Sequence, residues 1–144
     1  MKISAQVKSS EGSHELYLKT NENAHSIEIP PKASGFGSSA NGGELLFLAL
    51  ATCYCNDIYR EAAKRNIKVR NVQVEVSGDF GETPGSRAEN VVYRAIVEAE
   101  ASEADILDLM QHTDTMAEIQ NTLRQATPVR LEATKAISIT QESK

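Results

Sequence analysis

The sequence predicts an α+β fold built as one domain over residues 1–144. Two observations lead to this prediction. Several short segments alternate apolar and polar residues with the period of two that is typical of half-buried strands. One long segment, residues 44–66, is rich in apolar residues and indicates a central helix. The expected order is three strands, this helix, two strands, two helices and a last strand.

The N-terminal part of the chain is predicted to form three strands, at residues 3–7, 14–20 and 25–29. In the first strand Ile3, Ala5 and Val7 alternate with polar neighbours. Pro30 ends the third strand, because proline cannot donate a hydrogen bond to a strand ladder. A loop rich in serine and glycine follows at residues 32–43.

A long helix is predicted from about residue 43 to about residue 66, with Asn41 or a nearby serine as its cap. Its first three turns are apolar on every side, so they should be covered all round. Its last turns, which include Arg60 and Glu61, are amphipathic and should reach solvent.

The second half of the chain is predicted to begin with strands at residues 67–78 and 90–101, joined by a loop at 81–87. Val72, Val74 and Val76 give the first of these strands its alternation.

Two short helices are expected next, at residues 103–112 and 116–125, and a final strand at 136–141. Ser102 with Asp105, and Thr115 with Glu118, have the spacing of boxes that start a helix. Pro128 should end the second of these helices.

Composition and charge exclude several classes of function. The net charge of −5 argues against binding nucleic acid, which requires a basic surface. The longest uncharged apolar run, residues 45–55, is too short to cross a membrane, and the N-terminus does not resemble a signal peptide. We therefore expect a cytoplasmic protein whose cysteines are thiols.

Cys53 and Cys55 carry the most reactive side chains in the sequence. On a helix, residues two apart point roughly 200° from one another, so these two thiols should neither form a disulfide nor bind one ion together. Cys53 shares a face with Asp57, and Arg60 lies two turns further along the same side. Because the histidines are scattered as well, we expect no metal site and no cofactor.

A helix that is apolar on every face needs two covering layers, whereas the expected strands form only one modest sheet. The simplest source of the missing layer is a second copy of the chain, in an intertwined homodimer. The two short helices are the alternative source.

The segment from Asn41 to Cys53, NGGELLFLALATC, resembles the OsmC/Ohr family of osmotically inducible and organic hydroperoxide resistance proteins. The spacing from Leu45 to Cys53 matches that family and singles out Cys53 rather than Cys55. Asp57 and the strand at 67–78 also resemble the corresponding parts of that family. The resemblance runs from about residue 40 to the end, is nearer the Pro-x-Glu-Leu subgroup, and implies an antiparallel sheet wrapped on a long central helix.

The resemblance also implies roles for individual residues. Cys53 takes the role of the thiol that attacks a hydroperoxide. The family's resolving cysteine corresponds to Thr127, which cannot form a disulfide. Glu44 and Arg60 are the candidates for the residues that adjust the reactivity of the thiol.

One departure from the family concerns its N-terminal arginine. No arginine precedes Arg60 in this chain. Lys19 or Lys32 could supply positive charge, but a lysine lacks the forked donor geometry of an arginine.

The resemblance leaves several functions open. The first is an enzyme in which Cys53 reduces a small hydrophobic hydroperoxide and an external thiol regenerates it. The alternative is a non-enzymatic dimer that binds a small apolar ligand or acts in a stress response without peroxidase turnover. A thiol transferase that acts on another electrophile would use the same cysteine.

Overall fold

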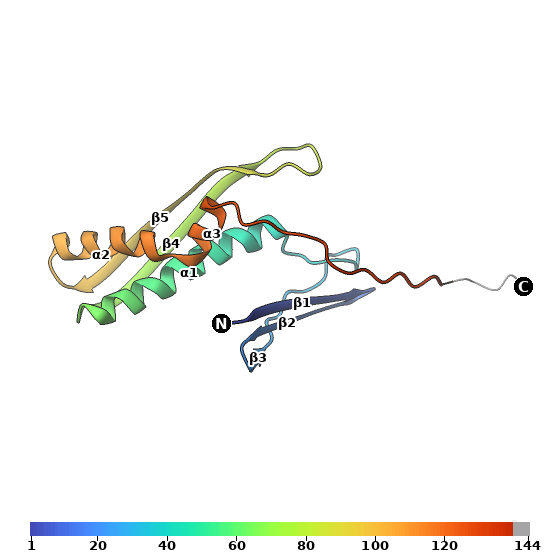
Figure 1. Ribbon diagram of the computed structural model, residues 1–144, viewed down its shortest axis with the longest axis horizontal. Helices are drawn as coiled ribbons and strands as arrows, with labels where there is room; N and C mark the ends of the chain where they lie inside the picture. The colour runs from blue at the N-terminus through green and yellow to red at the C-terminus, as the bar shows by residue number, and fades with distance from the viewer. Residues whose placement is uncertain (140–144) are drawn as a thin grey trace, which may run out of the picture.

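The computed structural model describes residues 1–139 of the chain and has an α+β architecture (Figure 1). Helices α1 and α2 pack on the long β4–β5 hairpin, and α3 packs on α1. None of the helices in the described part has the length and hydropathy needed to span a membrane. The elements are, in chain order, β1 (Ile3–Ser10), β2 (Ser13–Thr20), β3 (Asn23–His25), α1 (Gly42–Lys64), β4 (Lys68–Phe80), β5 (Ala88–Glu100), α2 (Glu103–Met116) and α3 (Glu118–Arg124).

Helix α1 begins where the sequence predicts, because Asn41 and Glu44 form a capping box. The Asn41 side chain accepts from the Glu44 amide at 2.8 Å, and the Glu44 carboxylate accepts from the Asn41 amide at 2.9 Å. These bonds satisfy two backbone donors that the first turn leaves free. At its other end, Asn66 has a φ of 55°, which turns the chain out of the helix and into β4.

The β4–β5 hairpin supplies the sheet on which the helices pack. Its register runs from Lys68 opposite Glu100 to Phe80 opposite Ala88, with irregularities at two points. The alternating valines of β4 turn toward the helices. There they meet a buried cluster made of Tyr54, Ile58 and Ala62 from α1 and Leu109 from α2.

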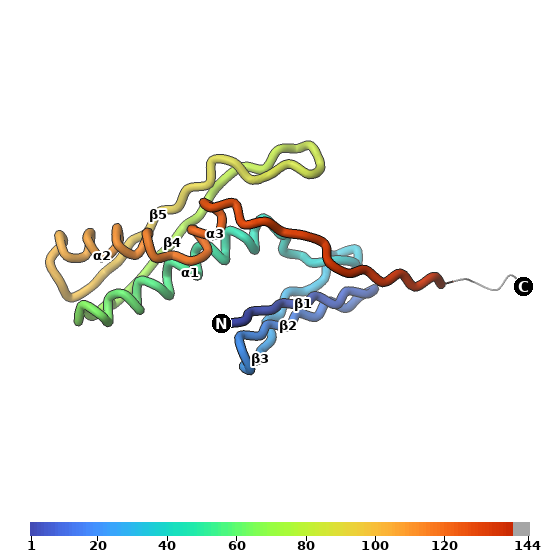
Figure 2. The backbone as a smooth tube through the Cα atoms, viewed as in Figure 1, coloured from blue at the N-terminus to red at the C-terminus, as the bar shows by residue number. Residues whose placement is uncertain are grey.

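The N-terminal strands form a second, separate sheet in the order β1–β2–β3, which corrects the prediction of a single sheet (Figures 1 and 2). The third strand covers Asn23–His25 instead of residues 25–29. Asn21 takes a positive φ in a tight turn, so pairing resumes at once with Asn23 opposite Thr20.

The two short helices are confirmed, with shifted ends. Ser102 caps α2 as predicted, its hydroxyl accepting from the Asp105 amide at 3.1 Å. Thr115 does not cap α3. Its hydroxyl donates to the carbonyl of His112 within α2, so α2 continues to Met116, and Ala117 joins the helices without a side-chain cap.

The final strand predicted at residues 136–141 is not formed as far as residue 139, and the rest of that prediction lies outside the described residues. A strand needs a neighbour to pair with. Residues 127–139 pair with no strand in the described part of the chain, and Val129 and Ile139 are almost fully exposed there.

Helix α1 is not covered all round within one chain, which agrees with the expectation that part of its cover must come from outside the sheet of a single copy. It contacts β4 on one side and α2 and α3 on another. The Leu48 side chain, in the apolar first half of the helix, remains 58% exposed. The other elements of the chain therefore cover only part of the apolar surface of α1.

We expect Gly78→Ala to destabilise the fold by about 1–3 kcal/mol, the usual cost of adding a methyl group to a packed site. A Cβ at Gly78 would lie 2.9 Å from the Phe47 ring, 3.1 Å from Val91 and 3.2 Å from the carbonyl oxygen of Glu89. Urea unfolding followed by circular dichroism measures the change. Gly42→Ala is the control, because nothing lies within 4 Å of a Cβ there. Equal stability of the two variants would contradict the expectation.

Candidate functional site

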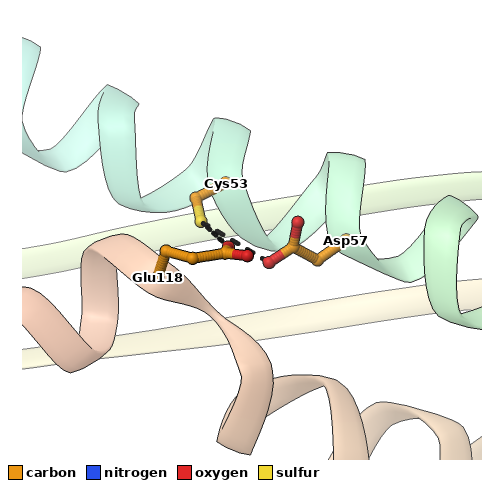
Figure 3. Close-up of side chains that lie close together, drawn as sticks. All are labelled: Cys53, Asp57 and Glu118. Atoms are coloured by element: carbon orange, nitrogen blue, oxygen red, sulfur yellow. Dashed lines mark hydrogen bonds between the residues drawn. The ribbon is translucent and has the colours of Figure 1, made fainter. Parts of the chain in front are cut away.

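The candidate site lies where α1 meets the start of α3, and Cys53 is at its centre (Figure 3). The half-buried Cys53 thiol is 3.6 Å from Asp57 Oδ2, one turn along α1. It is also 3.7 Å from Glu118 Oε2, at the first residue of α3. The thiol can therefore donate its proton to either of two carboxylates.

Arg60 joins this site through the carboxylates. Its Nη1 is 3.1 Å from Asp57 Oδ1 and 2.9 Å from Glu118 Oε1. The prediction that Arg60 lies on the Cys53 side of α1 is therefore confirmed, but its contacts are with the two acids. The guanidinium bridges two like charges that would otherwise repel one another.

The two carboxylates hold protons with unequal strength. Burial raises the pKa of Asp57 to about 6, and the hydrogen bond and charge of Glu118 add to the rise. The pKa of Glu118 is lowered, first by a backbone hydrogen bond and then by bonds with Asp57 and Arg60. The Asp57–Glu118 pair therefore takes up a proton at a higher pH than an isolated carboxyl group would.

The same surroundings act on the thiol. Burial raises the pKa of Cys53, and the charges of Asp57 and Glu118 raise it further, against the opposing effect of a hydrogen bond with the Ile119 backbone. At neutral pH, Cys53 is therefore a thiol that needs a proton acceptor in order to react.

Glu61 lies behind Arg60 and is buried. Arg60, Lys64 and Arg65 reach solvent as predicted, so Glu61 alone departs from the prediction for the last turns of the helix. Its side chain is 3% exposed. It accepts hydrogen bonds from Arg60 Nε and Lys64 Nζ, each at 2.9 Å, and lies 3.0 Å from His112 Nε2 of α2. The bond with Lys64, followed by the bond with Arg60, lowers the pKa of Glu61 to about 2.

Other residues singled out by the sequence lie elsewhere. Glu44 belongs to the capping box at the start of α1, nine residues and roughly 13 Å along the helix from Cys53. Thr127 follows α3, where its amide donates to the Thr122 carbonyl at 3.2 Å. Lys19 lies in β2, and Lys32 lies in the loop after the N-terminal sheet. In the part of the chain that the structure describes, no hydrogen bond or ion pair joins these residues to Cys53.

Cys55 faces away from the site, as the helical spacing predicts. It borders a shallow pocket together with Val74 of β4, on the other side of α1. Both cysteines are free thiols.

Glu118 is the site residue that the sequence did not indicate as a partner of Cys53. Its spacing from Thr115 suggested a capping role, and nothing in the pattern indicates where α3 docks on α1. Asp57 was recognisable, because four residues separate it from Cys53 on one helix face.

Cys53, Asp57 and Glu118 are also a possible set of metal ligands, with donor atoms that all lie within 4.8 Å of one another. The Arg60 guanidinium already balances both carboxylates in this arrangement. A cation at this position would have to compete with the Arg60 guanidinium for the same two carboxylates.

The chain is similar to proteins of known family and structure. The family described as OsmC-like protein matches residues 35–132. No curated protein sequence matches the chain.

Among solved structures, an OsmC-like protein from Mycoplasma pneumoniae is 18% identical with a TM-score of 0.59, over 85% of this chain and 86% of that chain. A hypothetical protein from Aquifex aeolicus VF5 is 16% identical with a TM-score of 0.64, over 88% and 90%. An OsmC-like hydroperoxide resistance protein from Jannaschia sp. CCS1 is 16% identical with a TM-score of 0.55, over 94% and 93%. At these identities the likeness shows the fold alone.

We expect Asp57→Asn to lower the pKa of Cys53, because it removes a negative charge 3.6 Å from the sulfur. The rate of alkylation by iodoacetamide at pH 7 should rise on the order of threefold to tenfold, in a Cys55→Ser background that isolates Cys53. Asp108→Asn is the control, since Asp108 pairs with Arg65 and not with the site. An unchanged alkylation rate in Asp57→Asn would rule out this electrostatic account.

Proposed function

This chain belongs to the OsmC-like protein family, and on that premise we propose that it reduces organic hydroperoxides with the Cys53 thiol and an external thiol reductant. The observation that supports this proposal most directly is the pair of carboxylates facing the sulfur, at 3.6 and 3.7 Å. They supply the proton acceptor that a thiol with a raised pKa requires. The hydroperoxide resistance protein from Jannaschia sp. CCS1 adds support through the shared fold.

The reaction proceeds in balanced steps. The Cys53 sulfur attacks the terminal oxygen of the hydroperoxide, an S–O bond forms and the O–O bond breaks. The thiol proton passes to the Asp57–Glu118 pair, and the departing alkoxide takes up a proton to become an alcohol. Cys53 is oxidised to a sulfenic acid.

We propose that regeneration uses a second thiol from outside the chain, because the resemblance to the family implies that Thr127 takes the place of the resolving cysteine. One molecule of reductant attacks the sulfenic acid, releases water and forms a mixed disulfide. A second molecule then releases the Cys53 thiol and leaves as a disulfide. Such a cycle suits the cytoplasm, where small thiols are kept reduced.

A non-enzymatic binding role is the second candidate. The raised pKa of Cys53 favours it, because a protonated thiol is a poor nucleophile. A cavity of about 760 Å³ between α1, β5 and α3 has the size of a ligand site. Its lining is partly apolar, with Leu46, Leu50 and Leu123, and partly charged, with Arg87, Glu89 and Arg124.

We also propose that the working form is a homodimer. Apolar side chains are exposed on three separate elements of the single chain: Leu48 and Tyr59 on α1, Ile3 and Val7 on β1, and Val92 and Ile96 on β5. The separate N-terminal sheet would provide a second layer for the α1 helix of a partner (Figure 1). Burial of these surfaces would stabilise the pair by the hydrophobic effect.

The reductase activity is tested by following consumption of cumene hydroperoxide in the presence of dithiothreitol. We expect turnover in the wild type and in Cys55→Ser, and none above background in Cys53→Ser, since only Cys53 faces the carboxylates. Absence of turnover in the wild type would contradict the proposal and favour the binding role. Turnover that survives in Cys53→Ser would assign the reaction to another group.

A second set of variants in the same assay tests the proton acceptor. Asp57→Asn together with Glu118→Gln should slow turnover by about 10²-fold or more, the usual contribution of a general base, although it increases the thiolate fraction. Faster turnover in this double variant would show that the two carboxylates only lower the reactivity of the Cys53 thiol and do not act as its proton acceptor.

The dimer is tested by analytical ultracentrifugation. We expect a mass of twice the 15.7 kDa of one chain. Leu48→Glu should shift the protein toward the monomer, because it inserts a charge into the proposed interface. A monomeric wild type at micromolar concentration would contradict this proposal and leave the reductase proposal to its own assay.

A further inference from the structure

We infer that Glu61 is a positioning residue, which holds the Arg60 guanidinium against the two carboxylates that face the Cys53 thiol. Glu61 does not touch the thiol and acts only through Arg60. The importance of Glu61 for catalysis rests on the proposed function, whereas its contacts with Arg60 are part of the structure.

Arg60 uses two parts of its guanidinium for two tasks. Its Nε donates to Glu61 Oε2 at 2.9 Å. Its Nη1 reaches Asp57 Oδ1 at 3.1 Å and Glu118 Oε1 at 2.9 Å. The planar group is rigid, so a bond that holds Nε also fixes the direction in which Nη1 points.

Glu61 is suited to be the fixed end of this arrangement. It is 3% exposed, whereas the Arg60 side chain is 40% exposed and that of Glu118 is 60% exposed. A buried carboxylate is tolerated only when it is fully paired. Lys64 supplies a second partner from α1, and His112 supplies a third from α2.

The exposed Arg60–Glu118 contact alone would not hold Arg60 in place, and Asp57, although buried, contacts only Nη1, at 3.1 Å. A pair such as Arg60–Glu118, in which both partners reach solvent, stabilises its geometry weakly, because ordering two long side chains costs entropy. Glu61 lies next to Arg60 in the same helix and is anchored by two other residues. Its bond to Nε therefore decides whether the guanidinium stays between Asp57 and Glu118 or turns toward solvent.

Removal of this anchor has a defined electrostatic consequence. The groups that face Arg60 are Asp57 and Glu61 from α1 and Glu118 from α3, while Lys64 and His112 face Glu61. The positive charge of Arg60 lowers the pKa of Asp57 and that of Glu118. If Arg60 turns away, Asp57 must hold its proton more tightly.

The test is a ¹³C-carboxyl NMR titration of Asp57, which reads the site without any turnover. In the full-length protein, Glu61→Gln should raise the proton affinity of Asp57 by roughly tenfold, in the range that loss of a nearby opposite charge produces. Arg60→Gln should raise it by at least as much. The double variant Arg60→Gln/Glu61→Gln should match Arg60→Gln, because Glu61 acts only through Arg60.

Arg65→Gln is the matched control. It removes one positive charge from the same end of α1, and the ion pair of Arg65 is with Asp108 of α2 at 2.6 Å and not with Glu61, Asp57 or Glu118. We expect the Asp57 titration to stay as in the wild type. A merely structural role for Glu61 would alter stability in Glu61→Gln without moving this titration.

Several outcomes would overturn the inference. An unchanged Asp57 titration in Glu61→Gln would do so, and so would an effect in the double variant that exceeds that of Arg60→Gln. If Glu61→Gln does not fold, Glu61→Asp replaces it in the test. This variant keeps the negative charge on a shorter side chain, and it should also raise the proton affinity of Asp57. If hydroperoxide turnover is absent while the titrations behave as expected, the proposed function fails and the positioning role of Glu61 stands.

Discussion

The packing of α1 beside α2 on the β4–β5 hairpin is the constraint on which the rest of the structure depends. One stripe of α1, formed by Tyr54, Ile58 and Ala62, meets Leu109 of α2 and the inner side chains of the hairpin. That stripe sets the rotation of the helix about its axis. Cys53 and Asp57 are thereby turned toward α3, and Cys55 is turned toward the opposite side.

The same packing draws acidic side chains into the protein. Asp57 and Glu61 are both buried, one on each side of Arg60 in the sequence, and burial of a carboxylate is costly unless a cation or a hydrogen-bond donor compensates it. For Glu61 the compensation is complete, with three basic partners. For Asp57 it is partial. Burial, and after it the hydrogen bond and negative charge of Glu118, raises the pKa of Asp57, whereas the bonds with Lys64 and Arg60 lower that of Glu61. The thiol lies on the side where compensation is partial, and the side chains to which it hydrogen-bonds are carboxylates that can accept its proton.

Much of the fold follows from local patterns, and the departures have identifiable causes. The capping box of Asn41 and Glu44 fixes the start of α1, and alternation of valines identifies β4. The last predicted strand is not formed in its described part, up to residue 139. Alternation indicates that a segment can form a strand, but it does not show whether a second strand is available to pair with it. Thr115 fails as a cap because its hydroxyl has a competing acceptor, the His112 carbonyl, inside the preceding helix.

The sequence by itself determined the α+β class, the central helix, the family and the placement of Cys53 and Cys55 on different sides of that helix, because these depend on residue patterns within continuous segments. Only the tertiary structure decided what surrounds the thiol. Glu118 lies 65 positions from Cys53, and His112 lies 51 positions from Glu61. Contacts across such distances depend on how α2 and α3 dock on α1, which is decided by the packing of side chains from several elements at once and leaves no periodic signal in any one of them.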